Sequence, residues 1–368
     1  MNELSFLWID TPEALAHLVE RLASASEVAL DTEFVFERTY WPRPGLVQLA
    51  AHGEIALVDA VGLELTPLAA LVTAPEVRKL VHAASGDAVV IERTTGARPT
   101  PVFDTQIAAA FCGLGVGISY EALVRTLFDV SLGKHHTRTD WTRRPLSPEQ
   151  LHYAAEDVLH LGAVAAELRE RLVALGRLAW AEEDSAASIA VEPGADDPEQ
   201  AWTRIRGAER LPPAVLARAR ALAAWRDSEA RRRDLPKTFL LRDESLIELS
   251  WRPVLDVEAL ASVRGFEPRR HGAFARAVVE LLERLAAAPA PAEAGDRPRA
   301  PSGSLDRAVA RAVDEVAAAL SLPPELLLSR RARTRLLTGL PAGESPVGRL
   351  AGWRRDVLGA AIERALVG

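Results

Sequence analysis

The feature of this 368-residue sequence that most restricts its fold is a short apolar run interrupted by two acids. Residues 28–34, VALDTEF, have the pattern of a buried strand, and Asp31 and Glu33 stand two positions apart in it. Because side chains alternate along a strand, both carboxylates leave the same face. A chain with this segment is therefore expected to build a sheet that carries an acidic group on one face.

The segments that follow predict the rest of this sheet. Residues 46–60, LVQLAAHGEIALVDA, indicate two short strands around a turn at His52 and Gly53. Residues 77–84, VRKLVHAA, predict a further strand, and residues 85–93 turn into a helix. From there the pattern is mostly helical, which favours an α/β domain with a mixed sheet covered by helices.

A long helix is predicted from Ser147 to about Leu175. In SPEQ, Ser147 and Gln150 stand at the spacing of a capping box, and the proline between them suits a first helical turn. Tyr153 and Asp157 then lie one turn apart on the same face. In isolation this pair is more often an ordinary helix face than part of a site.

The sequence divides into an α/β domain over residues 1–180 and helical regions after it. Residues 181–199 are acidic and poor in large apolar side chains, which predicts a linker. Residues 200–289 and 304–368 have helical patterns, and the Pro- and Ala-rich residues 290–303 predict a second linker. The whole is expected to be α/β plus all-α, with two helical modules on tethers.

Composition restricts the class of protein. The single cysteine excludes an internal disulfide and favours a reducing compartment. No signal-peptide pattern or apolar run of ~20 residues is present, so we expect a cytoplasmic protein that does not enter a membrane. The net charge of −7 is uneven: residues 1–200 have 15 basic and 30 acidic side chains, whereas the remainder is net +8. This asymmetry suggests that the later modules could meet a polyanion.

The acids of the first domain form a spaced set with the chemistry of a metal site. Asp87 stands at a strand-to-helix junction, and Asp31, Glu33 and Asp157 come from other elements. Two like charges 4 Å apart repel by about 4 kcal/mol even at an effective dielectric of about 20, so a shared pocket needs cations. Oxygen ligands favour Mg²⁺ or Mn²⁺, and two such ions suit phosphodiester hydrolysis.

Several gapped motifs, in the same order, resemble those of the DEDD exonucleases of the tyrosine-containing subgroup, and among them bacterial ribonuclease D. They are ALDTEFVFERTYWPRPGLVQLA, VHAASGDAVVIE, PVFDTQIAAAFCG and TRTDWTRRPLSPEQLHYAAEDVLHL, which together span about residues 25–175. Residues 222–250, LAAWRDSEARRRDLPKTFLLRDESLIELS, and their surroundings look like a helicase and ribonuclease D C-terminal (HRDC) domain. Residues 304–368 resemble a second, divergent HRDC-like unit.

This resemblance implies a ribonuclease H-like fold and 3′ to 5′ exoribonuclease activity that releases nucleoside 5′-monophosphates with two divalent ions, Mg²⁺ or Mn²⁺. Its catalytic set falls on Asp31, Glu33, Asp87, Tyr153 and Asp157, where the four acids are the metal ligands and Tyr153 orients the attacking water or helps to take its proton. It also implies that the substrates are single-stranded RNA 3′ ends, with precursor tRNA as the main class, and that no obligatory protein partner is needed, so we expect a monomer. Asp104 is expected to be a structural cap rather than a ligand, and Gly86 replaces an acid that relatives often carry.

Candidate RNA-binding residues surround this set. Arginine and aromatic side chains suit the backbone and bases of single strands, although loop arginines and helix charges are more often simply solvated. Before the catalytic helix the candidates are Arg138, Trp141, Arg143 and Arg144, and in the helical region they are Arg231, Arg232, Arg233 and Lys237. Phe34 and Tyr40 are candidates for base stacking, with core packing as the alternative for Phe34. Two other functions remain open at this level: a DNA 3′ to 5′ exonuclease, and a non-catalytic nucleic-acid-binding scaffold.

Overall fold

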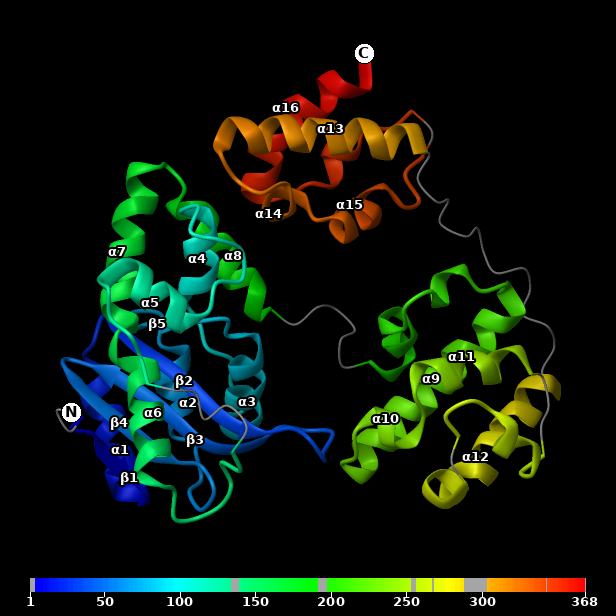
Figure 1. Cartoon of the computed structure of the whole chain (residues 1–368), viewed down its shortest axis with the longest axis horizontal. Coiled ribbons are helices and arrows are strands. Elements are labelled where there is room, and N and C mark those ends of the chain that lie inside the picture. The colour runs from blue at the N-terminus through cyan, green and yellow to red at the C-terminus, as the bar shows by residue number, and fades with distance from the viewer. Residues whose placement is uncertain are drawn as a thin grey trace. The chain divides into compact units, whose positions relative to one another are not determined.

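The computed structural model describes residues 4–133, 139–190, 197–252, 256–266, 268–287, 303–341 and 343–367. The chain forms two compact units (Figure 1). The first unit comprises Met1–Val35, Pro44–Ala190 and Pro298–Gly368, and the second comprises Phe36–Arg43 and Val191–Arg297. No helix in the described residues is long and apolar enough to cross a membrane.

A six-stranded mixed sheet forms the centre of the first unit, in the order β1-β4-β3-β2-β5-β6. Strand β1 pairs parallel to β4, β4 antiparallel to β3, and β5 parallel to both β2 and β6. His52 and Gly53 have φ of 54° and 78° and form the turn between β3 and β4, as predicted. The strands are β1 Leu7–Ile9, β2 Glu27–Val35, β3 Arg43–Ala51, β4 Glu54–Asp59, β5 Arg78–Val81 and β6 Val102–Asp104.

Helices cover both faces of this sheet, and strand β2 shows how the two faces differ. Val28 and Leu30 belong to one hydrophobic core, together with residues of α1, α2 and α3, whereas Ala29 belongs to the other, with α4 to α7. Asp31 and Glu33 stand two and four positions after Ala29, so their side chains leave the same face of the strand as Ala29. This is the face covered by α6, which contacts β2 and β4. The helices are α1 Pro12–Leu22, α2 Leu68–Thr73, α3 Ser85–Thr95, α4 Thr105–Phe111, α5 Tyr120–Phe128, α6 Pro148–Leu159, α7 Leu161–Ala174 and α8 Leu178–Ile189.

The predicted long helix is in fact two helices. Ser147 and Gln150 form the expected capping box at the start of α6, with both reciprocal hydrogen bonds present. The helix then ends at Leu159, and His160, with φ −98° and ψ −5°, joins it to α7. The Tyr120 hydroxyl accepts a hydrogen bond from the His160 backbone N–H at 3.2 Å, so a residue remote in sequence supports the break.

The predicted linker at residues 181–199 is wrong over its first half, because α8 occupies it. The acids there are paired rather than solvated: Glu182 lies 2.9 Å from Arg78, and Asp184 bonds both the Trp353 indole and the Arg354 guanidinium. The buried residues of α8 are Ala181, Ser185 and Ile189, so most of this face consists of small side chains, and the segment is poor in large apolar residues. Residues 191–196 lie outside the described part of the chain.

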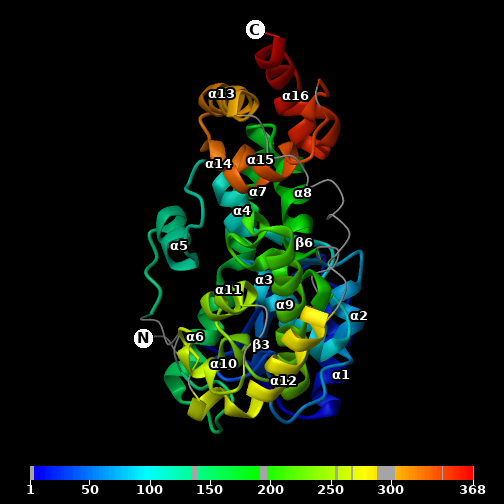
Figure 2. The same cartoon turned by 90° about the vertical axis from the view of Figure 1, so that its right-hand side faces the viewer.

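The C-terminal helices belong to the first unit, contrary to the expectation of a tethered module. Trp353 stacks on Trp180 with ring centres 5.0 Å apart and meets Phe111 edge-on at 5.3 Å. Figures 1 and 2 show α13 to α16 beside α4, α7 and α8. The second predicted linker lies largely outside the described residues. The helices are α13 Gly303–Leu320, α14 Pro324–Leu328, α15 Arg330–Leu337 and α16 Gly352–Val367, with the 3-10 turn η4 Pro346–Arg349.

The second unit is helical and has its own core. Its apolar centre joins residues from η1 to α12, including Leu222 of α9 and Leu246 of α11. Asp234 caps the end of α9 in a left-handed conformation. The elements are η1 Pro198–Arg204, η2 Ala208–Arg210, α9 Pro213–Arg233, α10 Lys237–Leu240, α11 Asp243–Trp251, η3 Ala259–Ser262 and α12 Pro268–Ala287.

Candidate active site

Three predicted ligands meet in one cluster on the face of the sheet under α6. One carboxylate oxygen from each of Asp31, Glu33 and Asp157 lies within 4.8 Å of the others. Strand β2 supplies the first two from alternate positions, and α6 supplies Asp157 because the capping box sets the phase of that helix. All three side chains are partly buried. Strand and helix thus bring together acids that are more than 120 residues apart in sequence.

Asp87 stands beside this cluster, in the first turn of α3. Its Oδ1 accepts a 2.5 Å hydrogen bond from the Thr32 hydroxyl, the residue between Asp31 and Glu33. Asp104 builds this turn as the predicted cap. Its carboxylate accepts hydrogen bonds from the backbone N–H groups of Ala83 and Ala84, before α3, and also caps α4. The turn that presents Asp87 is therefore held by a second acid that is not itself a ligand.

Burial and, for Asp31 and Glu33, the negative charges of nearby acids raise the pKa values of the carboxyl groups at this site. Burial, followed by the neighbouring charges of Asp87, Asp157 and Glu33, raises the pKa of Asp31 well above its ordinary value. Burial, together with Asp157 and Asp87, raises the pKa of Glu33 to about 9. Burial also raises the pKa of Asp87 to about 6, although the Thr32 hydroxyl opposes the shift. In the absence of cations Glu33 therefore keeps its proton at neutral pH, whereas Asp87, with its lower pKa, is mostly ionised there.

The donor set fits hard divalent cations. The clustered side chains of Asp31, Glu33 and Asp157 offer carboxylate oxygens, which Mg²⁺ and Mn²⁺ prefer, and no histidine or cysteine among the described residues joins them. Within the part of the chain that the structure describes, no other group of three or more His, Cys, Asp or Glu side chains has this geometry. Cations would offset the burial and the mutual repulsion that raise the pKa values of Asp31 and Glu33. The residues present therefore fit the divalent ions that the sequence resemblance implies.

Tyr153 lies on α6 one turn before Asp157, as its spacing predicted. Burial, the nearby acids and a hydrogen bond to Asp157 raise the pKa of its hydroxyl, so the group stays protonated. Its ring lies 6.0 Å from that of Trp141. A pocket of about 190 Å³ opens beside it, lined by Ser119, Tyr120, Glu121, Leu132, Gly133, Tyr153, Glu156 and Asp157.

Tyr120 is a site residue that sequence reasoning missed. It begins α5, lines the pocket, and has a raised pKa because of burial and then the charges of Asp157 and Asp31. No motif spacing connects it to the acids, because α5 approaches the pocket only through the tertiary fold. The signal available in the sequence was Ser119, the cap of α5, which fixes where that helix begins.

Glu156 is one position before Asp157 on α6, so helix geometry predicts that its side chain leaves a different face. It lines the same pocket, but its carboxylate accepts a hydrogen bond from the Gly133 backbone N–H at 3.0 Å and lies 3.5 Å from His152. It is absent from the cluster of candidate ligands. The expected contrast between Glu156 and Asp157 therefore remains, with a loop-holding contact added to the former.

Two of the four RNA-binding candidates before α6 are structural. Trp141 is 1% exposed and packs against Gly45, so it does not offer a face to a base. The Arg144 guanidinium bonds Asp59 at 2.5 Å and the carbonyl of Gly45 at 2.6 Å. Arg143 is exposed and keeps its candidacy, whereas Arg138 lies outside the described residues.

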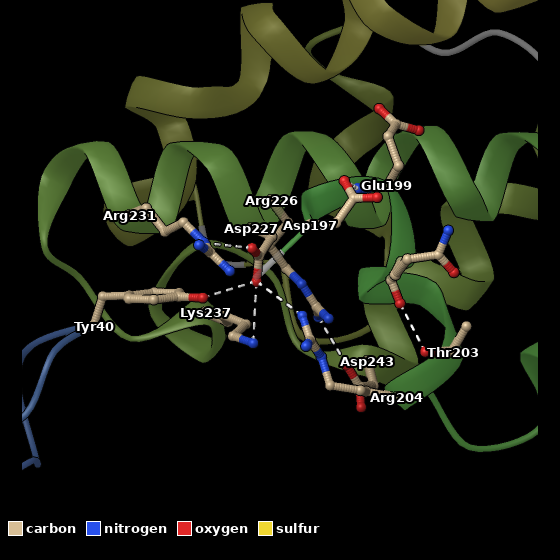
Figure 3. Close-up of polar contacts among 11 residues, drawn as sticks. Tyr40, Asp197, Glu199, Thr203, Arg204, Arg226, Asp227, Arg231, Lys237 and Asp243 are labelled. Atoms are coloured by element: carbon tan, nitrogen blue, oxygen red, sulfur yellow. Dashed lines mark hydrogen bonds and ion pairs between the residues drawn. The ribbon is translucent and has the colours of Figure 1, made fainter. Parts of the chain in front are cut away.

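The four candidates of the helical region all make ion pairs within the second unit. Arg231 and Lys237 pair with the buried Asp227, at 2.7 and 3.1 Å (Figure 3). Arg232 and Arg233 both pair with Glu229. These cations hold α9 and its surroundings together, so the sequence prediction of a basic RNA-binding face is not supported by their contacts. The two stacking candidates also make contacts within the protein. A Cβ added to Gly86 would lie 3.3 Å from the Phe34 ring, a tight contact that favours glycine at this position. The Tyr40 hydroxyl donates a hydrogen bond to Asp227.

Comparison with known proteins agrees with this geometry. Residues 6–173 match the family model described as 3′-5′ exonuclease, and residues 215–282 match that of the HRDC domain. A ribonuclease D of Gluconacetobacter diazotrophicus is 39% identical over 95% of this chain and 90% of its own. The ribonuclease D of Escherichia coli K12 is 33% identical over 99% of both chains.

The solved structures include one of the same architecture over the whole length. The crystal structure of Escherichia coli RNase D, described as an exoribonuclease involved in structured RNA processing, has a TM-score of 0.87 and 31% identity. The superposition covers 99% of both chains. From this similarity, and from the acids that α6, α3 and β2 bring together, we conclude that the chain belongs to the ribonuclease D family of 3′ to 5′ exoribonucleases.

Proposed function

We propose that this protein trims RNA from its 3′ end and that Asp31, Glu33, Asp87 and Asp157 hold two divalent ions, Mg²⁺ or Mn²⁺, for that reaction. The observation that supports this most directly is the convergence of three of these carboxylates within 4.8 Å, with Asp87 beside them. Burial, together with the neighbouring acids, raises the pKa values of Asp31 and Glu33, a perturbation that is common at functional sites and supports this proposal. A structural role would not require that arrangement.

The chemistry divides between the ions and the protein. When bound, two such ions lower the pKa of the attacking water and stabilise charge on the phosphodiester oxygens. The four acids would hold these ions, and Tyr153 presents a protonated hydroxyl one turn before Asp157 on α6. We assign Tyr153 to orienting the water through its hydroxyl, since its raised pKa disfavours a role as base. Each cycle releases a nucleoside 5′-monophosphate without a covalent enzyme intermediate.

The proposed substrates are single-stranded 3′ extensions of structured RNA, with precursor tRNA as the main class. Structured RNA processing is what is said of the Escherichia coli enzyme, whose chain this one covers almost completely, and precursor tRNA is what the sequence resemblance implies. The single cysteine suits a cytoplasmic setting, and we expect the protein to act as a monomer.

A substrate comparison tests the proposal. A tRNA with several extra 3′ nucleotides, the same tRNA with a mature end, and a DNA oligonucleotide of the extension sequence would be incubated with the protein in Mg²⁺ or Mn²⁺. We expect stepwise shortening of the extended tRNA, little change in the mature one, and slower removal from DNA. Equal rates on RNA and DNA would contradict the preference for RNA, and shortening of the mature tRNA at the rate of the extended one would contradict the proposed substrate class.

A further inference from the structure

Asp227 is the centre of a polar network inside the second unit. Its side chain on α9 is completely buried, and Figure 3 shows the groups that converge on it. The Tyr40 hydroxyl donates to Oδ1 at 3.1 Å, Lys237 Nζ lies 3.1 Å from the same oxygen, and Arg231 Nε lies 2.7 Å from Oδ2. Arg204 approaches Oδ1 at 3.5 Å. A buried carboxylate is stable only when it is paired in this way.

A second acid holds the backbone of the same loop. Asp234, at the end of α9, accepts hydrogen bonds from the backbone N–H groups of Tyr40 and Trp41 at 3.0 and 3.1 Å. Its other oxygen lies 3.6 Å from Arg43. Asp227 therefore holds the side chain of Tyr40, while Asp234 holds the backbone N–H groups of Tyr40 and Trp41.

The cations of the network also face the aromatic rings. The Arg231 guanidinium lies 5.3 Å from the centre of the Tyr40 ring and 5.5 Å from that of Trp41, and Lys237 Nζ lies 5.4 Å from the Tyr40 ring. Within this distance a cation is attracted by the ring face. Residues that the sequence offered as RNA ligands are thus used to hold an aromatic loop.

The protonation states support a network that is fully formed at neutral pH. Burial alone would raise the pKa of Asp227, but Lys237 and Arg231 outweigh it and lower the pKa, so the carboxylate is ionised. Burial and the charge of Asp227 raise the pKa of Tyr40 to about 12, so its hydroxyl remains a donor.

The loop held here is the connection between the two central strands of the catalytic sheet. Residues Phe36–Arg43 belong to the second unit, although β2 ends just before them and β3 begins at the last of them. Glu33 stands only three positions before Phe36. We propose that Tyr40 and Asp227 are positioning residues for the exonuclease reaction: by fixing this loop on α9 they restrict the end of β2 from which Glu33 projects. This inference rests on the proposed function. It assigns the helical unit a role in catalysis because that unit holds the loop between β2 and β3, and not because it contacts RNA.

Tyr40→Phe is the most selective test, because it removes one hydrogen bond from the network and leaves the ion pairs of Asp227 in place. We expect kcat on a short unstructured RNA to fall about fivefold with KM within twofold, since a small misplacement of a catalytic group lowers turnover. The affinity for Mn²⁺ alone, measured by calorimetry without RNA, should weaken by a similar factor. Asp227→Asn should show the same pattern more strongly.

Glu229→Gln is the matched control, because Glu229 lies on the same helix and pairs with two arginines but does not contact the loop. It should leave kcat and Mn²⁺ affinity unchanged. A second pair of variants keeps the test independent of folding. Asp234→Asn retains an oxygen that accepts hydrogen bonds from the loop, so it should behave like the parent. Asp234→Gly suits the left-handed φ of 50° but removes the acceptor, so it should behave like Tyr40→Phe.

The outcomes separate the possible failures. If the parent protein does not trim RNA, the proposed function is wrong whatever the variants do. If the parent trims and Tyr40→Phe and Asp234→Gly keep its kcat and Mn²⁺ affinity, the positioning role is wrong. A rise in KM with a shallower salt dependence and unchanged kcat would also overturn it, because that pattern indicates direct RNA binding by the cations.

Discussion

At the scale of single residues, the acids of the site show a conflict between stability and function. Glu33 lies where burial and two other carboxylates disfavour its charge. A sequence selected only for stability would place a neutral side chain there. Such conflicts are expected at functional sites, where a local cost is accepted because the ligand removes it.

Glu33→Gln should therefore stabilise the metal-free protein while it abolishes activity. The folded-state pKa of about 9 is above that of an unfolded chain, so the stabilising contribution of the protonated form is present at acidic pH and is lost as the pH rises toward 9. We expect the melting temperature of the parent, measured in EDTA, to fall between pH 5 and 9 and that of the variant to fall less. Glu37→Gln, on the exposed loop, is the control. Equal pH dependence in parent and Glu33→Gln would refute the assignment.

Tyr153→Phe and Glu156→Gln should separate two neighbours on α6. The first removes the hydroxyl that bonds Asp157, and kcat should fall by about 10- to 100-fold with a small change in KM. The second keeps the ability to accept from Gly133 and should stay within about threefold of the parent. Steady-state kinetics on one RNA checks both, and a Tyr153→Phe variant that keeps the parental kcat would show that Tyr153 acts only through packing.

At the scale of elements, the sequence was most informative where one residue sets a local geometry. The capping box at Ser147 predicted the start of α6 and hence the common face of Tyr153 and Asp157. It could not predict the break at His160, because Tyr120 supports that break from another helix. Likewise α8 could not be distinguished from a linker, since the partners of Asp184 are about 170 residues away.

Asp104→Ala should weaken the element that presents Asp87. The carboxylate accepts the amides of Ala83 and Ala84 and caps α4, so its loss leaves buried donors unpaired. We expect the free energy of unfolding, measured with urea, to fall by about 1–3 kcal/mol. Activity should fall as well, because the turn before Asp87 loosens. An unchanged unfolding midpoint would show that other contacts hold this turn.

At the scale of the whole molecule, the order of the exonuclease and HRDC regions was predictable from motifs, but the grouping of the C-terminal helices was not. Their Ala- and Leu-rich pattern indicates helices without indicating what they pack against. The structure places Trp353, 4% exposed, in one core with Phe111 of the exonuclease region. Deleting all residues after 197 to test RNA binding would therefore also remove part of the first unit.

Removing residues 298–368 should destabilise the exonuclease unit itself. The truncation exposes Trp180 and Phe111, which Trp353 covers, and leaves Asp184 without its indole and guanidinium partners. Trp353→Ala in the full chain should lower the free energy of unfolding by about 3–5 kcal/mol. Calorimetry checks both variants, and an exonuclease unit that melts at the parental temperature after truncation would contradict the shared core.

The central claim is that Asp31 and its neighbouring acids make a metal-dependent site that removes nucleotides from RNA 3′ ends. Its most direct test is the length distribution of a 5′-labelled single-stranded RNA after incubation of the parent protein and Asp31→Asn over a range of Mn²⁺ concentrations. We predict a ladder of products that shortens one nucleotide at a time for the parent, its loss in EDTA, and no ladder for an Asp31→Asn protein that melts at least as high as the parent. A ladder of parental rate from Asp31→Asn, or one that persists in EDTA, would contradict the account.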